Sequence, residues 1–542
     1  MSHPHSGDRP VGNLHGTRSP VFGTAGVIAC SHPLASAAGL QIFQQGGNAI
    51  DAAVTAAAVL AVVEPSMTGI GGDVFALVYD AATRTLEALN SSGRAGARAD
   101  AGRLTAAGLH EMPPHGPYAV TVPGAVAGWA ELLRRRGTIS LARAIAPAIR
   151  FARHGHAVSD IVAEHWDRSA ARIAADAPAA QLLLPGGRPP RAGEIFRNPE
   201  LANCLEQIAS DGERAMYGGA LGKAIAADIT RRGGFLGEDD FAAHTSNWVD
   251  PIHTTYRGHD IYEMPPNSQG FVAIEMLNVL EGYDVAGMGH NSADYLHLLV
   301  EAKRIGFADR GAYLADPAHV PAGVLDTLLS KEYAAARRRE IDLRRTAAAY
   351  AGGVSFAQRD LGDTVYLAAA DDKGNVISFI NSLFDLFGAG IVVPGTGIVL
   401  HSRGSGFSLQ PGHPNQLAPG KRPLHTLAPA FVMKDGKPLM AFGVTGGDNQ
   451  AQAHAQVVVN VVDFGMNVQE AGEAARVRHS DAGLAVESAV DESVRADLRR
   501  RGTTVLNGRG EMGGYQAVAI DPQTGVLIGG SDPRKDGCAL GW

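Results

Sequence analysis

Apolar residues along the chain follow two periods, one helical and one of alternating strands. Helical spacing predicts helices over residues 38–63, 125–136, 141–153 and 293–311. Apolar and polar residues alternate on both sides of a short polar turn, which predicts paired strands at residues 74–80 and 85–89. The longest apolar run, Ala52 to Val63, is shorter than the roughly 20 residues that span a bilayer. It therefore predicts a buried Ala-rich helix, and no membrane partner is expected.

The pattern changes in the last third of the chain. Residues 342–363 are polar and contain glycines, which is typical of an exposed linker that can be cleaved. Beyond this linker, two hairpins are predicted, the first joining residues 365–370 to 376–381 and the second joining 430–434 to 438–444. Periodicity alone indicates a mixed α/β or α+β fold.

Composition fits a globular enzyme and excludes several other classes of protein. The chain has 542 residues, of which 45% are hydrophobic and 19% charged, so it can bury a large core. A net charge of -8 argues against nucleic acid as a partner. The three cysteines are too far apart for a metal-ligand pattern, so no metal site is expected. The N-terminus lacks the apolar segment of a secretion signal, and a cytoplasmic location is expected.

Thr364 stands directly after the polar linker, at the start of the first predicted hairpin. If the chain is cut between Asp363 and Thr364, the freed α-amine can act as general base for the threonine hydroxyl. The reference pKa of an α-amine, about 7.7 to 8.0, suits that role near neutral pH. The alternative is structural, because β-branched residues favour strands for packing reasons alone.

Several further segments resemble the γ-glutamyltransferase (glutathione hydrolase) family of N-terminal-nucleophile enzymes, and they follow one another in the order found in that family. They are GNAIDAAVTAAAVLAVVEPSMTGIGGD (47–73), VPGAVAGW (122–129), EAKRIGFADRGAYLADP (301–317), FGAGIVVPGTGIVL (387–400), TGGDNQ (445–450) and SDPRKDG (531–537). The resemblance implies an α+β fold of the four-layer αββα sandwich type. It also implies a proenzyme whose large fragment (1–363) and small fragment (364–542) stay together as one catalytic domain, without a cofactor.

The resemblance also assigns roles in catalysis. Gly446 and Gly447 match the glycine pair that stabilises the oxyanion, and they lie between a predicted strand and a predicted helix. The alternative for an isolated glycine pair is a turn needed only for backbone geometry. Ser382 matches a hydroxyl residue that hydrogen-bonds the nucleophile, and its neighbour Asn381 is predicted to contact the substrate. The family's second threonine is Val365 here.

The substrate-binding positions depart from those of γ-glutamyl enzymes. An arginine that holds the α-carboxylate is replaced by Ser92, with Arg94 two positions later. An acid that holds the α-amine is replaced by Gly406, with Arg403 nearby. The remaining changes replace two serines and an asparagine with His425, Thr426 and Phe384. Together these segments resemble the branch that contains oxamate amidohydrolase.

A pocket without its acid is expected to bind an α-amine poorly, because an unpaired buried charge is costly. Arg94 and Arg403 can instead clamp a carboxylate, and His425 and Thr426 are predicted to line the same site. For each arginine, the alternative is an ordinary structural ion pair.

The predicted function is therefore a self-cleaving threonine amidohydrolase acting on a small carboxylate-bearing amide, either an oxamate-type acid amide or a γ-glutamyl compound. One alternative is an ordinary glutathione hydrolase or γ-glutamyltransferase, and another is an unprocessed pseudoenzyme that only binds an anion or a partner. Besides the substrate, the predicted partners are the two fragments of the chain and a second copy of the processed heterodimer.

Overall fold

Two seven-stranded sheets lie face to face in the computed structural model, which describes residues 17–352, 364–508, 510 and 512–542. The first sheet contains, in order, β21 (Cys538–Gly541), β2 (Gly26–Cys30), β10 (Val365–Asp371), β11 (Val376–Ser382), β3 (Asp73–Asp80), β4 (Thr85–Ser91) and β7 (Asn247–Val249). The second contains β1 (Val21–Gly23), β20 (Leu527–Ser531), β19 (Tyr515–Ile520), β15 (Lys437–Val444), β14 (Ala430–Lys434), β9 (His259–Glu263) and β8 (Ile252–Tyr256). In both sheets, strands from before and after Thr364 lie side by side.

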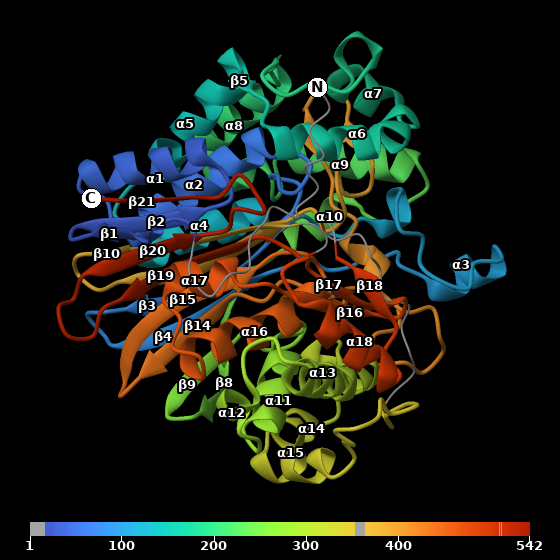
Figure 1. Ribbon diagram of the computed structural model, residues 1–542. Coiled ribbons are helices and arrows are strands. Elements are labelled where there is room, and N and C mark those ends of the chain that lie inside the picture. Colours follow the sequence, from blue (N-terminus) through green and yellow to red (C-terminus); the bar gives the residue numbers. More distant parts are fainter. Residues whose placement is uncertain (1–16, 353–363, 509, 511) are drawn as a thin grey trace.

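Helices cover the outer face of each sheet, so that Figure 1 shows helices, sheet, sheet and helices from top to bottom. The first sheet is covered by α1 (Pro33–Gln44), α2 (Ala49–Val63) and α4 (Ala125–Arg136), with α5 (Leu141–His154) and α8 (Pro199–Asp211) beyond them. The second is covered by α11 (Gly270–Leu280), α16 (Asn449–Val462) and α17 (Val468–Glu473), with α13 (Ala293–Tyr313) packed on α11. The predicted α+β class and the four-layer arrangement are confirmed.

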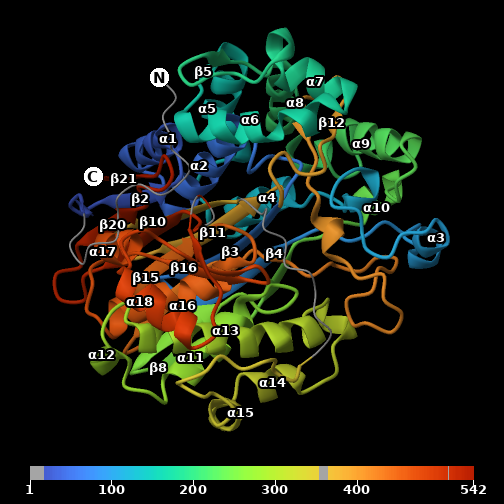
Figure 2. The same cartoon turned by 45° about the vertical axis from the view of Figure 1, so that its right-hand side comes forward.

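Peripheral helices extend the two helical layers, as the turned view shows (Figure 2). Above the first sheet lie α6 (Asp160–Ala174), α7 (Ala177–Leu183) and α9 (Ala220–Arg231). At the opposite end lie α14 (Val324–Leu328) and α15 (Lys331–Arg338). None of the helices in the described residues combines the length and the apolar character needed to cross a bilayer.

The alternation of side chains along β10 builds the core on both of its faces. Val365 and Leu367 face the helical layer and join the core around α2. Tyr366 and Ala368 face the second sheet and join the core between the sheets. This two-sided burial follows from the period of two along a strand. It explains why the strand is apolar from Val365 to Ala370, and Thr364 directly precedes this central element.

The helix predicted over residues 38–63 is wrong in one respect, because the chain forms two helices there. Gly46 has a left-handed φ of 82°, which ends the first helix. Asn48 then starts α2 through a capping box in which its side chain accepts a hydrogen bond from the Asp51 N–H and Asp51 accepts one from the Asn48 N–H. The strand pair at 74–80 and 85–89 and the two predicted hairpins are confirmed.

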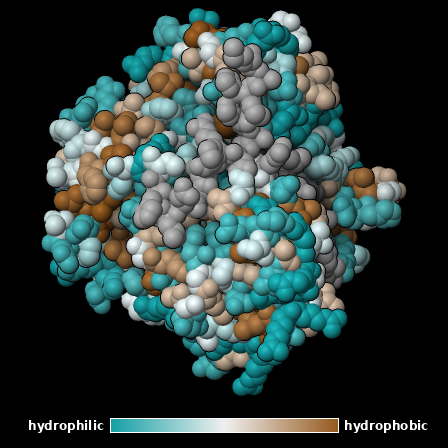
Figure 3. Space-filling model, viewed as in Figure 1, coloured by the Kyte–Doolittle hydropathy of each residue, from teal (hydrophilic) through white to brown (hydrophobic). Residues whose placement is uncertain are grey.

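Hydrophobic residues gather on the left of the face shown in Figure 3, over the sheet edges where β1, β20 and β21 lie, whereas the lower part is mostly hydrophilic. Exposed apolar side chains at this edge include Phe22, which is 60% exposed, and Trp542, which is 51% exposed.

Candidate active site

Thr364 lies at the head of β10, in the centre of the first sheet, and is 2% exposed. Val365 pairs with Asn381 in the antiparallel ladder, which places Thr364 opposite Ser382, the last residue of β11. The Thr364 hydroxyl donates a hydrogen bond to Ser382 Oγ at 3.1 Å. Ser382 Oγ also accepts the Phe384 N–H at 2.7 Å, so its position is fixed from two sides. Asp363, the other side of the predicted cleavage site, lies outside the described residues.

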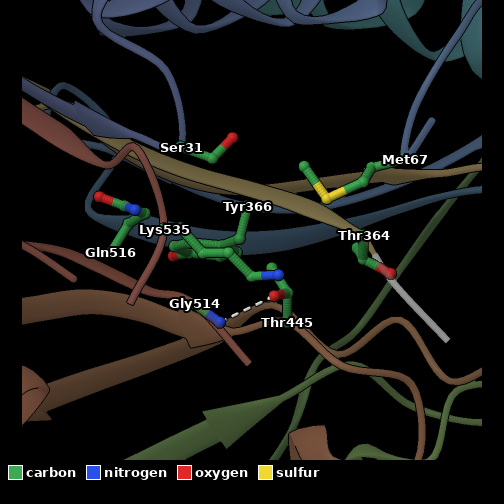
Figure 4. Close-up of a pocket in the computed structure, with 8 residues that line it drawn as sticks. All are labelled: Ser31, Met67, Thr364, Tyr366, Thr445, Gly514, Gln516 and Lys535. Atoms are coloured by element: carbon green, nitrogen blue, oxygen red, sulfur yellow. Dashed lines mark hydrogen bonds between the residues drawn. The ribbon is translucent and has the colours of Figure 1, made fainter. Parts of the chain in front are cut away.

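A small pocket surrounds Thr364 and joins residues from both sheets (Figure 4). Its lining consists of Ser31, Met67, Thr364, Tyr366, Thr445, Gly514, Gln516 and Lys535. Thr445 is held in this pocket by two hydrogen bonds with Gly514, one from the Thr445 N–H at 3.0 Å and one to the Thr445 Oγ1 at 2.9 Å. The side-chain amide of Gln516 is buried, and neither its Nε2 nor its Oε1 has a hydrogen-bond partner among the described residues.

Gly446 and Gly447 follow Thr445 between the end of β15 and the start of α16. Both have left-handed φ angles, 108° at Gly446 and 58° at Gly447, which glycine adopts at little cost. Their carbonyls accept the N–H groups of Asn449 and Gln450, whereas neither glycine N–H donates to an acceptor in the described part of the chain. Two backbone donors beside the positive end of a helix suit an oxyanion.

Gln269 supports this turn, although only its place in the segment PNSQG (266–270) marks it in the sequence. Its Nε2 donates to the Gly447 carbonyl at 2.9 Å and to the Thr426 carbonyl at 2.8 Å. Gln269 is fully buried, directly before α11. It therefore ties the glycine turn to the segment that carries His425 and Thr426.

Arg403 is fully buried and has no carboxylate within ion-pair distance among the described residues. Its Nη1 donates to Thr426 Oγ1 at 3.0 Å, and its guanidinium carbon lies over the Phe384 ring, 4.1 Å from the centroid. Nε and Nη2 have no hydrogen-bond partner in the described residues. Burial lowers the pKa of the guanidinium to about 9, although acidic side chains nearby oppose the shift. A buried cation with two unused donors is the expected form of an anion site.

His425 takes a structural position instead of facing a ligand. Its Nε2 lies 3.1 Å from Asp73 Oδ2, and its Nδ1 accepts the Leu427 N–H at 3.3 Å, so both ring nitrogens are engaged. Burial and the charge of Arg403 lower the pKa of His425 to about 3, so the ring is neutral. Thr426, by contrast, contacts Arg403 directly.

Asp73 connects this region, although in the sequence only the motif that contains it, residues 47–73, marks it. Its Oδ1 accepts the N–H groups of Gly93 and Gly124, both at 3.1 Å, and His401 Nδ1 lies 3.4 Å from Oδ2. Burial alone raises the pKa of Asp73, but His401 and the hydrogen bond with His425 hold it well below its usual range. Asp73 is thus a buried anion beside His401 and His425.

Two of the predicted substrate residues have partners within the protein. Arg94 is 43% exposed at its side chain and donates to Asp316 at 3.3 Å and to the Gly420 carbonyl at 3.0 Å. Asn381 donates to the Asp73 carbonyl and accepts from Trp129 Nε1, on the helical side of the sheet. The structure therefore brings Thr364, Ser382 and the glycine turn together, and it places Arg403 and Thr426 together, but it directs Arg94 and Asn381 elsewhere.

Comparison with known proteins agrees with this geometry. The family model described as Gamma-glutamyltranspeptidase matches residues 35–542. The chain belongs to the gamma-glutamyltranspeptidase family. It is 39% identical over 532 residues to the glutathione hydrolase-like YwrD proenzyme of Bacillus subtilis, covering 96% of this chain and 99% of that one. It is 34% identical over 534 residues to the oxamate amidohydrolase proenzyme of Klebsiella pneumoniae, covering 96% and 99%.

Among solved structures, the chain resembles the cephalosporin acylase from Bacillus halodurans with a TM-score of 0.92 and 39% identity, covering 100% of this chain and 98% of that one. The family and the fold make the protein an N-terminal-nucleophile amidohydrolase. These relatives bear different activity names, so membership in the family leaves the substrate to be argued from the pocket.

Proposed function

We propose that the chain cuts itself between Asp363 and Thr364 and that mature Thr364 then hydrolyses the amide bond of a small, carboxylate-bearing substrate. The observation that supports this proposal most directly is Arg403, a fully buried cation with two donors that have no partner in the described residues. An anion would stabilise such a group further, and a substrate carboxylate can supply it through paired hydrogen bonds.

The catalytic steps follow from the groups around Thr364. Its freed α-amine takes the proton of Oγ while Oγ attacks the amide carbonyl, and Ser382 Oγ keeps the hydroxyl in place. The N–H groups of Gly446 and Gly447 stabilise the oxyanion that forms. The protonated amine gives its proton to the leaving nitrogen, the carbon–nitrogen bond breaks, and water then hydrolyses the acyl-enzyme with the α-amine again as base.

The charges around Arg403 favour an acid amide over an α-amino acid. Gly406 brings no acid to the turn that carries Arg403, and Asp73, a buried anion near Arg403, is already bonded to His425 and two backbone N–H groups. A substrate ammonium would therefore lie near a buried cation without an anionic partner of its own. This arrangement supports an oxamate-type or other monoamide substrate over glutathione.

A second candidate is an acylase that removes a carboxylate-bearing acyl group from a larger amine. The resemblance to a cephalosporin acylase across the whole chain favours it. Both candidates use the same acyl pocket and differ only in the leaving amine.

The first experiment tests processing. Purified protein is separated on a denaturing gel, and the small fragment is sequenced from its N-terminus. The wild-type chain is expected to give a small fragment that begins at Thr364, whereas Thr364→Ala stays full length. An active enzyme that remains one intact chain would refute the mechanism.

The second experiment tests the substrate class on matured protein. Ammonia release from oxamate is compared with release from oxamide, its neutral diamide, and with turnover of glutathione and a cephalosporin. We expect Arg403→Gln to raise KM for the anionic substrate roughly 10- to 150-fold, since a charge-assisted hydrogen bond contributes about 1.5 to 3 kcal/mol. Arg94→Gln is the matched control and should leave KM nearly unchanged. If glutathione is the better substrate, the ordinary glutathione hydrolase alternative holds.

A further inference from the structure

Phe384 has a backbone conformation that an apolar aromatic residue rarely adopts. It follows β11 closely, is 7% exposed, and has a φ of 80°. A bulky residue in this left-handed region is strained, because its Cβ approaches the neighbouring carbonyl. Such strain persists only where the surrounding structure holds it, and it clusters at functional sites.

Two contacts hold Phe384 in this conformation, and they lead to the two halves of the proposed site. Its N–H donates to Ser382 Oγ at 2.7 Å, and Ser382 Oγ is the acceptor for the Thr364 hydroxyl. Its ring lies 4.1 Å from the guanidinium carbon of Arg403. One strained residue therefore contacts both the partner of the nucleophile and the proposed anchor for the carboxylate.

We infer that Phe384 is a specificity-determining residue. Its ring packs against the Arg403 guanidinium and leaves the donors Nε and Nη2, which lie in the guanidinium plane, for a substrate carboxylate. This inference rests on the proposed function. A ring stabilises a cation through its quadrupole without accepting any of the N–H groups. An acidic or amide side chain at this place would accept those donors and compete with the substrate.

The backbone of Phe384 has a separate task, because its N–H positions Ser382 whatever side chain the residue carries. Substitutions can therefore separate the two effects. Phe384→Leu removes the ring and keeps a branched side chain, Phe384→Tyr keeps the ring, and Phe384→Gly removes the ring and also frees the backbone from strain.

The test measures KM and kcat of matured variants for oxamate, or for the best anionic monoamide found, and for the matching neutral diamide. We expect Phe384→Leu to raise KM for the anionic amide roughly 10- to 30-fold, which is the factor that a desolvated cation–π contact contributes. Its KM for the diamide and its kcat for both should stay within about threefold, because the Ser382 contact comes from the backbone. Phe384→Tyr should resemble the wild type, and Phe384→Gly should lower kcat for both substrates.

Three results would overturn the inference. The first is a Phe384→Leu enzyme with unchanged KM for the anionic amide, and the second is an equal rise of KM for the diamide, which would mean a general packing defect. The third is a Phe384→Tyr enzyme as impaired as Phe384→Leu. Phe384→Met is measured beside the leucine variant, so that the comparison stands if one of them does not mature. A wild-type enzyme without any preference for the anionic amide would instead refute the proposed function.

Discussion

The Thr364 hydroxyl and Ser382 Oγ lie 3.1 Å apart across the antiparallel pair of β10 and β11, in the centre of a buried sheet. Ser382 in turn accepts the Phe384 N–H, so it cannot rotate away without losing that bond. The proposed nucleophile is thus held by the sheet itself and not by a loop.

Ser382→Ala should lower kcat of the matured enzyme roughly 2- to 12-fold, because a lost hydrogen bond of about 0.5 to 1.5 kcal/mol no longer orients the Thr364 hydroxyl. KM should change less than twofold, since Ser382 contacts Thr364 and not the acyl group. Steady-state kinetics on gel-verified, fully processed protein measures both values. Ser382→Thr keeps the hydroxyl and should recover most of the rate; a threonine variant as slow as the alanine variant would argue against the hydrogen bond as the cause.

Gly447→Ala should lower the rate roughly 10²- to 10³-fold, the usual effect of losing one oxyanion donor. The φ of 58° at this position disfavours any residue with a Cβ, so the turn and its N–H should move. Gly436→Ala is the matched control, because Gly436 has a φ of 71° in the turn at the other end of β15 and an added Cβ there meets nothing within 4 Å. Equal activity losses in the two variants would contradict the oxyanion role.

Binding of an anionic substrate should weaken above about pH 9. Burial lowers the pKa of Arg403 to about 9, so the guanidinium is charged below that pH and loses its proton as the pH rises through it. KM for the acid amide should therefore rise with pH, whereas KM for the neutral diamide should stay flat. Initial rates measured from about pH 7 to about pH 10 give KM as a function of pH for both substrates. A flat profile for the acid amide would show that the Arg403 guanidinium keeps its proton up to about pH 10.

Asp73→Asn should lower the free energy of unfolding by about 2 to 4 kcal/mol, the range for breaking a buried, charge-assisted network. The amide oxygen can accept the two backbone N–H groups, but the amide nitrogen cannot accept the hydrogen bond that His425 Nε2 donates to Asp73 Oδ2. Chemical denaturation of the uncleaved Thr364→Ala protein, with and without Asp73→Asn, measures the effect as a lower midpoint. Arg94→Gln, which removes a partly exposed ion pair, should shift the midpoint far less.

Local chemistry allowed much of the fold and part of the site to be predicted from the sequence. Period-two alternation marked β10 and β11, and the glycine pair between a strand and a helix marked the turn at Gly446. The two arginines show where such reasoning stops. Arg94 and Arg403 look alike in the sequence, but Asp316, which lies 222 positions away, engages the first, and the second is enclosed without a carboxylate partner among the described residues.

His425 shows the same limit in another way. Its replacement of a serine indicated a changed pocket, but only the fold brings Asp73 to its ring from 352 positions away. Long-range partners decide whether a polar side chain faces a ligand or supports one, and a single sequence does not contain those distances.

The strand order of the two sheets determines whether the protein can refold after it has been unfolded. In the first sheet, β10 and β11 lie between β2 and β3, and in the second, β14 to β20 lie between β9 and β1. A cut before Thr364 therefore leaves two polypeptides woven through each other, which cannot part while either sheet persists. Before the cut, folding is unimolecular. After the cut, a denatured enzyme must refold by association of two separate chains, which depends on protein concentration. Cleavage would thus make unfolding irreversible, and we expect the proenzyme to refold after removal of denaturant under conditions in which the cleaved enzyme does not.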